Sequence, residues 1–301
     1  MSFVSLAMGG GGRLYRRLVE EYFLPAFANA ELQKMNDAAV CGLSGDRIAL
    51  TTDSFVVQPR FFPGGDIGRL AVCGTVNDLA VSGARPMYLT CSMIIEAGFP
   101  LEELARICTS MAETARQAGV QIVTGDTKVV EKGGCDGLFI NTAGVGLFDS
   151  AQRILPQRPA VGDAILVSGN IGYHGMAILS ARENFGFEPP IPSDVAPLNQ
   201  IIDCLLRAVP QISCLRDATR GGVAAVLNEW AQQEQCHIVL QREQVPIADE
   251  IAAACDLLGL DPLYLANEGR FVAAVSAAQE FSIARSACVN GADRVDDVPA
   301  G

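Results

Sequence analysis

A glycine turn followed by a segment of small residues, FFPGGDIGRLAVCGTVNDLAVSGARP from Phe61 to Pro86, constrains this chain more than any other stretch. The Pro-Gly-Gly turn leaves main-chain amides uncovered, because glycine tolerates backbone angles that other residues avoid. From residue 67 to 84 the apolar residues recur at helical spacing, which predicts a closely packed helix with Asp66 at its start. Asn77 and Asp78 lie inside this apolar helix, where a charge is costly unless a cation or hydrogen bonds compensate it. A buried helix with one satisfied carboxylate is the alternative interpretation.

The length and charge of the chain limit its architecture and its partners. With 301 residues, 50% of them hydrophobic, the chain can bury a large core, and we expect two domains. The periodic pattern lapses between residues 149 and 162, so we place the domains at residues 1–150 and 151–301. Lys and Arg number 22 against 34 Asp and Glu, and the net charge of −12 opposes binding to nucleic acid or to an anionic membrane. Binding of a nucleotide is still compatible with this negative charge, because magnesium bridges protein carboxylates and nucleotide phosphates.

Cysteine usage and the N-terminal sequence predict a cytoplasmic protein. The 10 cysteines form no Cys-x-x-Cys pair, and most stand in apolar segments, as buried thiols do in a reducing compartment. The chain has 2 histidines and no clustered soft ligands, which argues against a zinc site. The first residues, MSFVSLAMGGGG, lack the basic region and apolar core of a signal peptide. No apolar run is long enough to span a membrane.

Glycines near the N-terminus form a candidate phosphate-binding loop. The run MGGGG, which includes Gly10 and Gly11, leads into a helical pattern. Such a loop can lay its amides on a phosphate at the positive end of the following helix. The run does not match the Gly-x-x-x-x-Gly-Lys-Ser/Thr loop, and a flexible N-terminal tail is an equal alternative.

Carboxylates recur where predicted strands and helices end in the first half of the chain. Asp53 interrupts a predicted strand at residues 47–57, and Asp126 follows a short predicted strand at 120–123, with Lys128 two residues later. With Asp66 and Asp78 they make four acidic groups near glycine turns. Magnesium prefers oxygen ligands and is held by a few carboxylates plus substrate phosphates, so the pattern suggests an ATP-handling site. Lys128 would neutralise charge on a transferred phosphoryl group; exposed residues or turn caps are the alternative.

The second half predicts further elements and one more candidate acid. We expect strands at residues 164–167 and 237–240 and helices at 198–209 and 248–258. The segment LRDATRGGV precedes another helix. Glu268, in LYLANEGR beside a glycine at the edge of a predicted strand, is a candidate site residue.

Several of these motifs resemble one family. DSFVVQPRFFPGGDIGRLAVCGTVNDLAVSGARP, SMAETARQAG, TGDTKVVEKG, LFINTAG, LRDATRGGV and LANEGR are similar to the hydrogenase maturation factors of the HypE family, in the superfamily of aminoimidazole ribonucleotide synthetase. The resemblance runs from about residue 5 to 298. It implies a two-domain α/β fold of the PurM-like type, which dimerises through its N-terminal half and binds ATP with Mg²⁺ in a cleft.

The resemblance also implies a reaction and its residues. Family members use ATP to dehydrate a thiocarboxamide on their own C-terminal cysteine to a thiocyanate, the source of the cyanide ligands of nickel-iron hydrogenase. Lys128 and Glu268 would lie near the thiocarboxamide. The expected magnesium and phosphate ligands are Asp53, Asp66, Asp78 and Asp126, assisted by Asn77 and Asn141. The implied partners are a second copy of the chain, a HypF-like carbamoyltransferase and a HypC/HypD-like complex.

The sequence departs from the family pattern at two places. The family tail finishes in Pro-Arg-Ile-Cys, whereas this sequence finishes in VDDVPAG, with Cys288 as its last cysteine. The family's early loop carries a histidine where this chain has Met8. A carbamoyl dehydratase is the leading hypothesis; a paralogue that phosphorylates a free small molecule and a non-catalytic scaffold for maturation partners are the alternatives. Magnesium-dependent ATP turnover, with and without a carbamoylated cysteine peptide, distinguishes the three.

Overall fold

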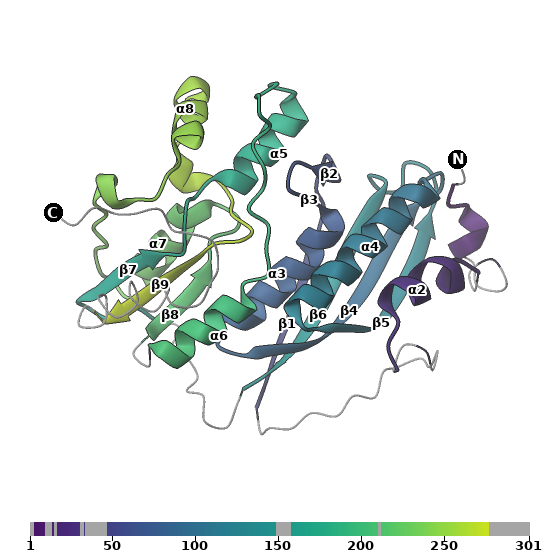
Figure 1. The fold of residues 1–301 in the computed structure, drawn as a ribbon, viewed down its shortest axis with the longest axis horizontal. Coiled ribbons are helices and arrows are strands. Elements are labelled where there is room, and N and C mark those ends of the chain that lie inside the picture. Colours follow the sequence, from purple (N-terminus) through teal and green to yellow (C-terminus); the bar gives the residue numbers. More distant parts are fainter. Residues whose placement is uncertain are drawn as a thin grey trace.

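The computed structural model describes residues 3–9, 14, 17–30, 33, 47–148, 158–209 and 212–276. These residues form a four-stranded sheet, a three-stranded sheet and a two-stranded hairpin, and the two parts built on the larger sheets lie side by side along the longest axis of the molecule (Figure 1). In these ranges no helix combines the length and the apolar character that a membrane crossing needs. The predicted domain boundary at residue 150 falls outside the described residues and stays a prediction.

A four-stranded sheet organises the N-terminal half. Its strands are β1 (Ile48–Phe55), β6 (Leu138–Leu147), β4 (Arg85–Glu96) and β5 (Gln121–Val130), in that spatial order. Only the β4–β5 pair is parallel. A short hairpin of β2 (Phe61–Phe62) and β3 (Gly65–Asp66) precedes helix α3 (Ile67–Val81), and helix α4 (Leu101–Ala118) connects β4 to β5. The short helices η1 (Leu6–Gly9), η2 (Val19–Phe23) and α2 (Leu24–Phe27) come first in the chain.

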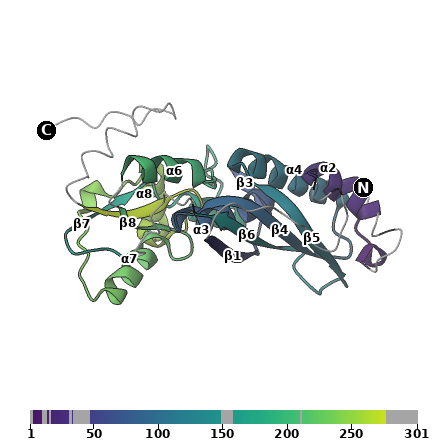
Figure 2. The same cartoon turned by 90° about the horizontal axis from the view of Figure 1, so that it is seen from below.

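Helices cover one face of this sheet and leave the other uncovered by the described part of the chain. Figure 2 shows α4 and α2 on one side of β4 and β5. The uncovered side, called the outer face below, carries Leu50, Ile94, Asp126, Lys128 and Asn141, which the strand register places on the same side of the sheet. Leu50 is 70% exposed and Ile94 is 41% exposed, although both are large and apolar. An exposed apolar sheet face of this kind is typical of an interaction surface.

Helix α3 is the predicted buried helix and joins the two halves. The side chain of Asp66 accepts hydrogen bonds from the amides of Gly68 and Arg69 and so caps its first turn. Glycine is required at Gly68, where a Cβ atom would lie 2.6 Å from the carbonyl oxygen of Ile107 in α4. The helix ends at Val81, three residues before the predicted end.

A three-stranded sheet organises the C-terminal half. Its order is β7 (Asp163–Val167), β9 (Phe271–Ser276) and β8 (Ile212–Asp217), and both pairs are antiparallel. The surrounding helices are α5 (Tyr173–Glu183), α6 (Asn199–Ala208), α7 (Gly222–Gln233) and α8 (Asp249–Leu258), with short turns η4 (Arg242–Gln244) and η5 (Pro262–Tyr264). The predicted strand at residues 237–240 is wrong. Its segment pairs with no sheet, and Val239 is 86% exposed, so it has no buried surface to align it.

Strand β5 is longer than predicted. The apolar pattern ends at Val123, but Thr124 to Val130 continue the strand because they pair with residues 90–96 of β4. This long-range pairing moves Asp126 and Lys128 from a predicted loop onto the outer face. Local sequence does not contain the pairing partner, so it could not predict this extension.

Candidate functional site

Two acidic side chains of the N-terminal half face each other where β1 meets α3. Asp53 pairs across the sheet with Thr142, whose hydroxyl donates to the Ala71 carbonyl in α3, so Asp53 lies on the helix-covered face. Asp78 accepts a hydrogen bond from the Thr51 hydroxyl at 2.8 Å. Burial raises the pKa of Asp78; the Thr51 hydrogen bond opposes this rise, and the charge of Asp53 adds to it.

Two acidic side chains of the C-terminal half complete the cluster. Asp217 ends β8, and Glu268 lies three residues before β9, which pairs with β8. Burial, followed by the charge of Asp78, raises the pKa of Asp217 to about 7. The pKa of Glu268 is raised well above its usual range, first by burial and then by the charges of Asp217, Asp194, Asp53 and Asp78. We call Asp53, Asp78, Asp217 and Glu268 the acidic cluster.

The acidic cluster favours a ligand that brings positive charge. Arg216, the guanidinium that lowers the pKa of Asp217, is itself paired with Glu229 at 2.8 Å. Within the described ranges, no three His, Cys, Asp or Glu side chains are close enough to hold a metal ion by themselves. Magnesium usually keeps several waters and is bound through one or two carboxylates plus substrate phosphates. The cluster therefore fits a metal that arrives with a nucleotide better than a permanently bound metal.

Asp66 and Asn77 have structural tasks in this arrangement. Asp66 uses its Oδ1 atom to cap α3. Asn77 is buried; its amide nitrogen donates to the carbonyls of Ala196 and Glu268, and its Oδ1 accepts from the Leu198 amide. These bonds fix the backbone of Glu268 relative to α3. Asn77 therefore contributes to the site by holding the Glu268 backbone in place.

Lys128, Asp126 and Asn141 lie on the other side of the sheet. Asn141 and Asp126 both pair with Ser92 of β4 and share the outer face with it. Asp126 and Lys128 form an ion pair of 3.3 Å, with side chains 57% and 68% exposed. Within one chain, the structure brings Asp53, Asp78 and Glu268 together and separates them from these three residues by the thickness of the sheet.

Gly10 and Gly11, the candidate phosphate-binding glycines, lie outside the described residues. Met8, two residues before Gly10, is partly buried and packs against the N-terminal hydrophobic core. Its apolar side chain suits this contact.

Sequence reasoning missed Asp217 and Asp194 as site residues. Asp217 carried a signal, because it ends an apolar strand immediately before the paired glycines of LRDATRGGV. Asp194 lies in a proline-rich segment that reads as a surface loop. Its proximity to Glu268, whose amide donates to Asp194 Oδ1 at 3.1 Å, is visible only in three dimensions.

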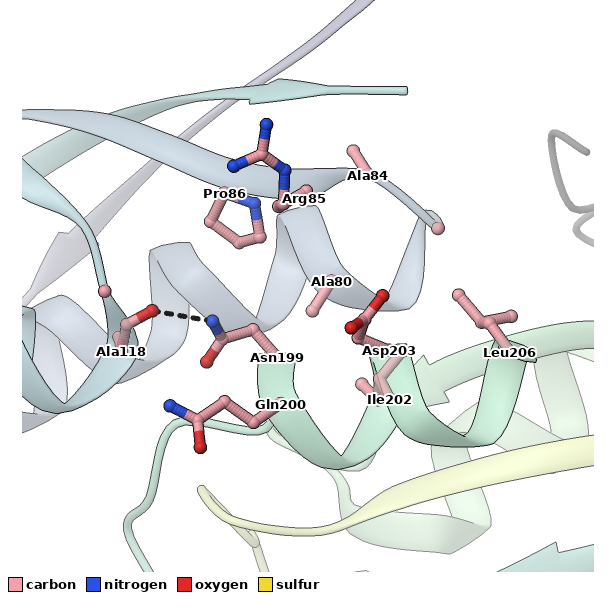
Figure 3. Close-up of a pocket in the computed structure, with 12 residues that line it drawn as sticks. Ala80, Ala84, Arg85, Pro86, Ala118, Asn199, Gln200, Ile202, Asp203 and Leu206 are labelled. Carbon is pink, nitrogen blue, oxygen red and sulfur yellow. Dashed lines mark hydrogen bonds between the residues drawn. The ribbon is translucent and has the colours of Figure 1, made fainter. Parts of the chain in front are cut away.

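A separate cavity of about 190 Å³ lies between α6 and the ends of α3 and α4. Figure 3 shows Asn199 in its wall, donating a hydrogen bond to the Ala118 carbonyl at 2.7 Å. Arg85 and Asp203 also line the cavity. None of the predicted site residues lines it, so it is distinct from the acidic cluster.

Comparison with known proteins identifies the family. Residues 35–148 match the AIR synthase related protein N-terminal domain, and residues 160–291 match the corresponding C-terminal domain. The chain is 51% identical over 270 residues to the carbamoyl dehydratase HypE of Azotobacter vinelandii, covering 90% of this chain and 79% of the relative. It is 49% identical over 280 residues to the Escherichia coli (strain K12) HypE, covering 91% and 83%. The chain belongs to the HypE family.

Solved HypE structures confirm the predicted PurM-like α/β fold. The crystal structure of HypE in complex with ATP aligns with a TM-score of 0.88 at 47% identity, covering 94% of this chain and 84% of that chain. HypE in the HypE–HypF complex aligns with a TM-score of 0.77 at 49% identity, covering 91% and 89%. Thiamine monophosphate kinase from Aquifex aeolicus, at 18% identity and a TM-score of 0.61 over 77% of this chain and 80% of that chain, shares the fold alone.

Proposed function

We propose that this chain is an ATP-dependent carbamoyl dehydratase, which converts a cysteine thiocarboxamide to a thiocyanate for the cyanide ligands of nickel-iron hydrogenase. The observation that carries the proposal is the acidic cluster, built by both halves of a chain about half identical to named carbamoyl dehydratases. ATP as a substrate is supported by the HypE–ATP complex. The described cysteines are all free thiols, which supports a cytoplasmic location.

The chemistry requires a phosphoryl transfer and then an elimination. The amide oxygen of the thiocarboxamide attacks the γ-phosphorus, ADP leaves, and the oxygen becomes part of a phosphate ester. Loss of both protons from nitrogen, one as the phosphorylated imidate forms and one in the elimination, together with departure of inorganic phosphate, then forms the carbon–nitrogen triple bond. Glu268 accepts a proton from nitrogen, because burial raises the pKa of its carboxyl well above the usual range and so makes the carboxylate a stronger base. Lys128 of a second copy of the chain would lie near the transferred group and balance its charge.

In this proposal Asp53 and Asp78 would hold the magnesium ion that accompanies the nucleotide. When bound, Mg²⁺ would neutralise the phosphate charge and orient the γ-phosphoryl group. Asp66 and Asp126 remain proposed ligands of the metal, and the main-chain amides of Gly10 and Gly11 remain proposed phosphate donors. Asn77 and Asn141 assist, Asn77 by holding the Glu268 backbone and Asn141 by donating to the Asp53 carbonyl at 2.9 Å.

A second copy of the chain covers the outer face in this proposal. The exposed apolar residues Leu50 and Ile94 on that face support the proposal, because a two-fold interface buries the same patch on both subunits. Lys128 and Asp126 also lie there, away from the acidic cluster of their own chain. Because β1, which carries Asp53, is an edge strand of the sheet, a dimer that sets this face against the partner's β1 edge would bring Lys128 near the partner's cluster.

Mixed dimers test this arrangement. Asp53→Asn and Lys128→Ala should each be inactive alone. If each site combines Asp53 of one chain with Lys128 of the other, one site of every mixed dimer is intact. Random reassociation of equal amounts should then restore about a quarter of wild-type activity. Mixed dimers that form, as shown by differently tagged chains, yet stay inactive would refute the shared site.

ATP turnover tests the activity itself. The purified chain is given Mg²⁺, ATP and a carbamoylated peptide ending in Pro-Arg-Ile-Cys, so that the substrate cysteine is supplied separately. We expect ADP and phosphate release that depends on the peptide, together with thiocyanate formation detected by mass spectrometry. Turnover of a free small molecule with no response to the peptide would favour a kinase, and no turnover under either condition would favour a scaffold.

We also propose two protein partners, on the basis of the chain's similarity to HypE proteins. The HypE–HypF complex supports a HypF-like carbamoyltransferase as the source of the carbamoyl group. A HypC/HypD-like complex would receive the cyanide.

A further inference from the structure

A strap at residues 193–198 lies between the two halves next to the acidic cluster. The Ser193 amide donates to the Pro63 carbonyl at 2.8 Å, and the Arg69 side chain donates to the Val195 carbonyl at 2.9 Å. On its other side the strap packs on Gly269, where a Cβ atom would lie 1.8 Å from the carbonyl oxygen of Asp194. The strap is therefore fixed from both sides, and Asp194 has little freedom to move.

The carboxylate of Asp194 is bonded to the backbone of Glu268. Its Oδ1 atom accepts a hydrogen bond from the Glu268 amide at 3.1 Å. Its Oδ2 atom is buried and has no hydrogen-bond partner. Burial raises the pKa of Asp194, while the hydrogen bond from Glu268 and the charge of Arg270 oppose that rise. A buried carboxylate with one unpaired oxygen lowers stability, so stability alone does not account for an acid at this position.

The Glu268 backbone is held at its amide and at its carbonyl, which also accepts a hydrogen bond from the Ala196 amide at 3.3 Å, and Asp194 supplies the partner of the amide. Asn77 of α3 donates to the Glu268 carbonyl at 3.3 Å, and Asp194 accepts from the Glu268 amide. Together these hydrogen bonds set the direction in which the Glu268 side chain leaves the backbone. Gly269, which follows, has no side chain of its own to restrict this segment, so the segment is held by these hydrogen bonds and by its close contact with the strap.

We propose that Asp194 is a positioning residue for the dehydration reaction and that it orients Glu268 toward the substrate by accepting its amide hydrogen. The inference rests on the proposed function, in which Glu268 accepts the substrate proton. A displacement of about 1 Å in a reacting group can reduce a rate about 100-fold. Loss of the acceptor should therefore lower kcat and leave the binding of ATP unaffected.

Two substitutions at Asp194 distinguish positioning from a general structural role. Asp194→Ala removes the acceptor and should lower kcat at least 10-fold. Asp194→Asn keeps an oxygen that can accept from the Glu268 amide, so its kcat should stay within about 3-fold of wild type. For both variants we expect the KM for ATP to change by less than about 2-fold. Asp256→Asn, an exposed acid of α8, is the matched control and should change neither constant.

The outcomes separate this inference from the proposed function. An inactive wild-type chain would refute the proposed function. An active wild type with an equally active Asp194→Ala variant would refute the positioning role alone. An Asp194→Asn variant as inactive as the alanine variant, or a large rise in the KM for ATP, would also refute it. Failure of both variants to fold, measured by circular dichroism and thermal unfolding, would assign Asp194 to the stability of the strap and overturn the inference.

Discussion

Glu268→Gln should lower the kcat of thiocarboxamide dehydration by about 10²–10⁴-fold, the usual contribution of a general base. Glutamine preserves the shape of the side chain but cannot accept the proton that must leave the amide nitrogen. The Glu268 backbone, which holds the bonds to Asn77 and Asp194, is unchanged by this substitution. Single-turnover assays of thiocyanate formation, with ATP affinity from calorimetry, measure the two effects separately.

The affinity for ATP should change by less than about 3-fold in the Glu268→Gln variant, because the substitution removes no side chain that the proposal assigns to the nucleotide phosphates. Glu183→Gln, an exposed acid at the end of α5, is the matched control and should behave as wild type. A Glu268→Gln variant that retains more than about a tenth of wild-type kcat would contradict the assignment of Glu268 as the base.

Asp217→Asn should stabilise the nucleotide-free protein at pH 8. Asp217 has its pKa raised from 3.8 to about 7 by burial and by Asp78, so the folded chain holds a proton that the unfolded chain releases between these pH values. Stability from this group therefore falls as pH rises from about 4 to about 7. Asparagine removes the cost of ionising the buried acid, on the order of 2 kcal/mol at pH 8 after allowance for partial exposure.

The way in which the stability difference between Asp217→Asn and wild type changes with pH tests whether Asp217 is the group responsible. Thermal unfolding between pH 5 and pH 8 should show a Tm advantage of several degrees for Asp217→Asn that grows with pH. Asp256→Asn, an exposed acid on α8, makes the same change of charge outside the cluster and should show no such trend. A variant that is less stable than wild type at pH 8, or a difference that does not depend on pH, would show that Asp217 is not strained by its acidic neighbours.

The local parts of the site could be predicted from the sequence. Small residues at helical spacing after a glycine turn predicted α3, with Asp66 at its start and Asp78 in its apolar interior. Alternation in β1 predicted a strand that contains Asp53. These features depend on residues close in the chain, where periodicity and capping preferences act directly.

The spatial relations of the site residues could not be predicted in the same way. The sequence predicts Asp126 and Lys128 in one site with Asp53, and the pairing of β5 with β4 places both residues on the outer face of their own chain. Asp194 and Asp217 reach the cluster through the contact of the C-terminal half with α3. Which face a side chain occupies depends on strand register, and a shift of one residue would reverse it.

The fate of the thiocarboxamide oxygen tests the central claim most directly. A peptide carrying an ¹⁸O-labelled carbamoyl group on its terminal cysteine is incubated with the chain, Mg²⁺ and ATP, and the released phosphate is analysed by mass spectrometry. If the chain activates the amide through phosphoryl transfer, each thiocyanate formed should be accompanied by one phosphate that contains ¹⁸O. Thiocyanate formed with unlabelled phosphate, or label that stays on the peptide while ATP is hydrolysed, would contradict the account.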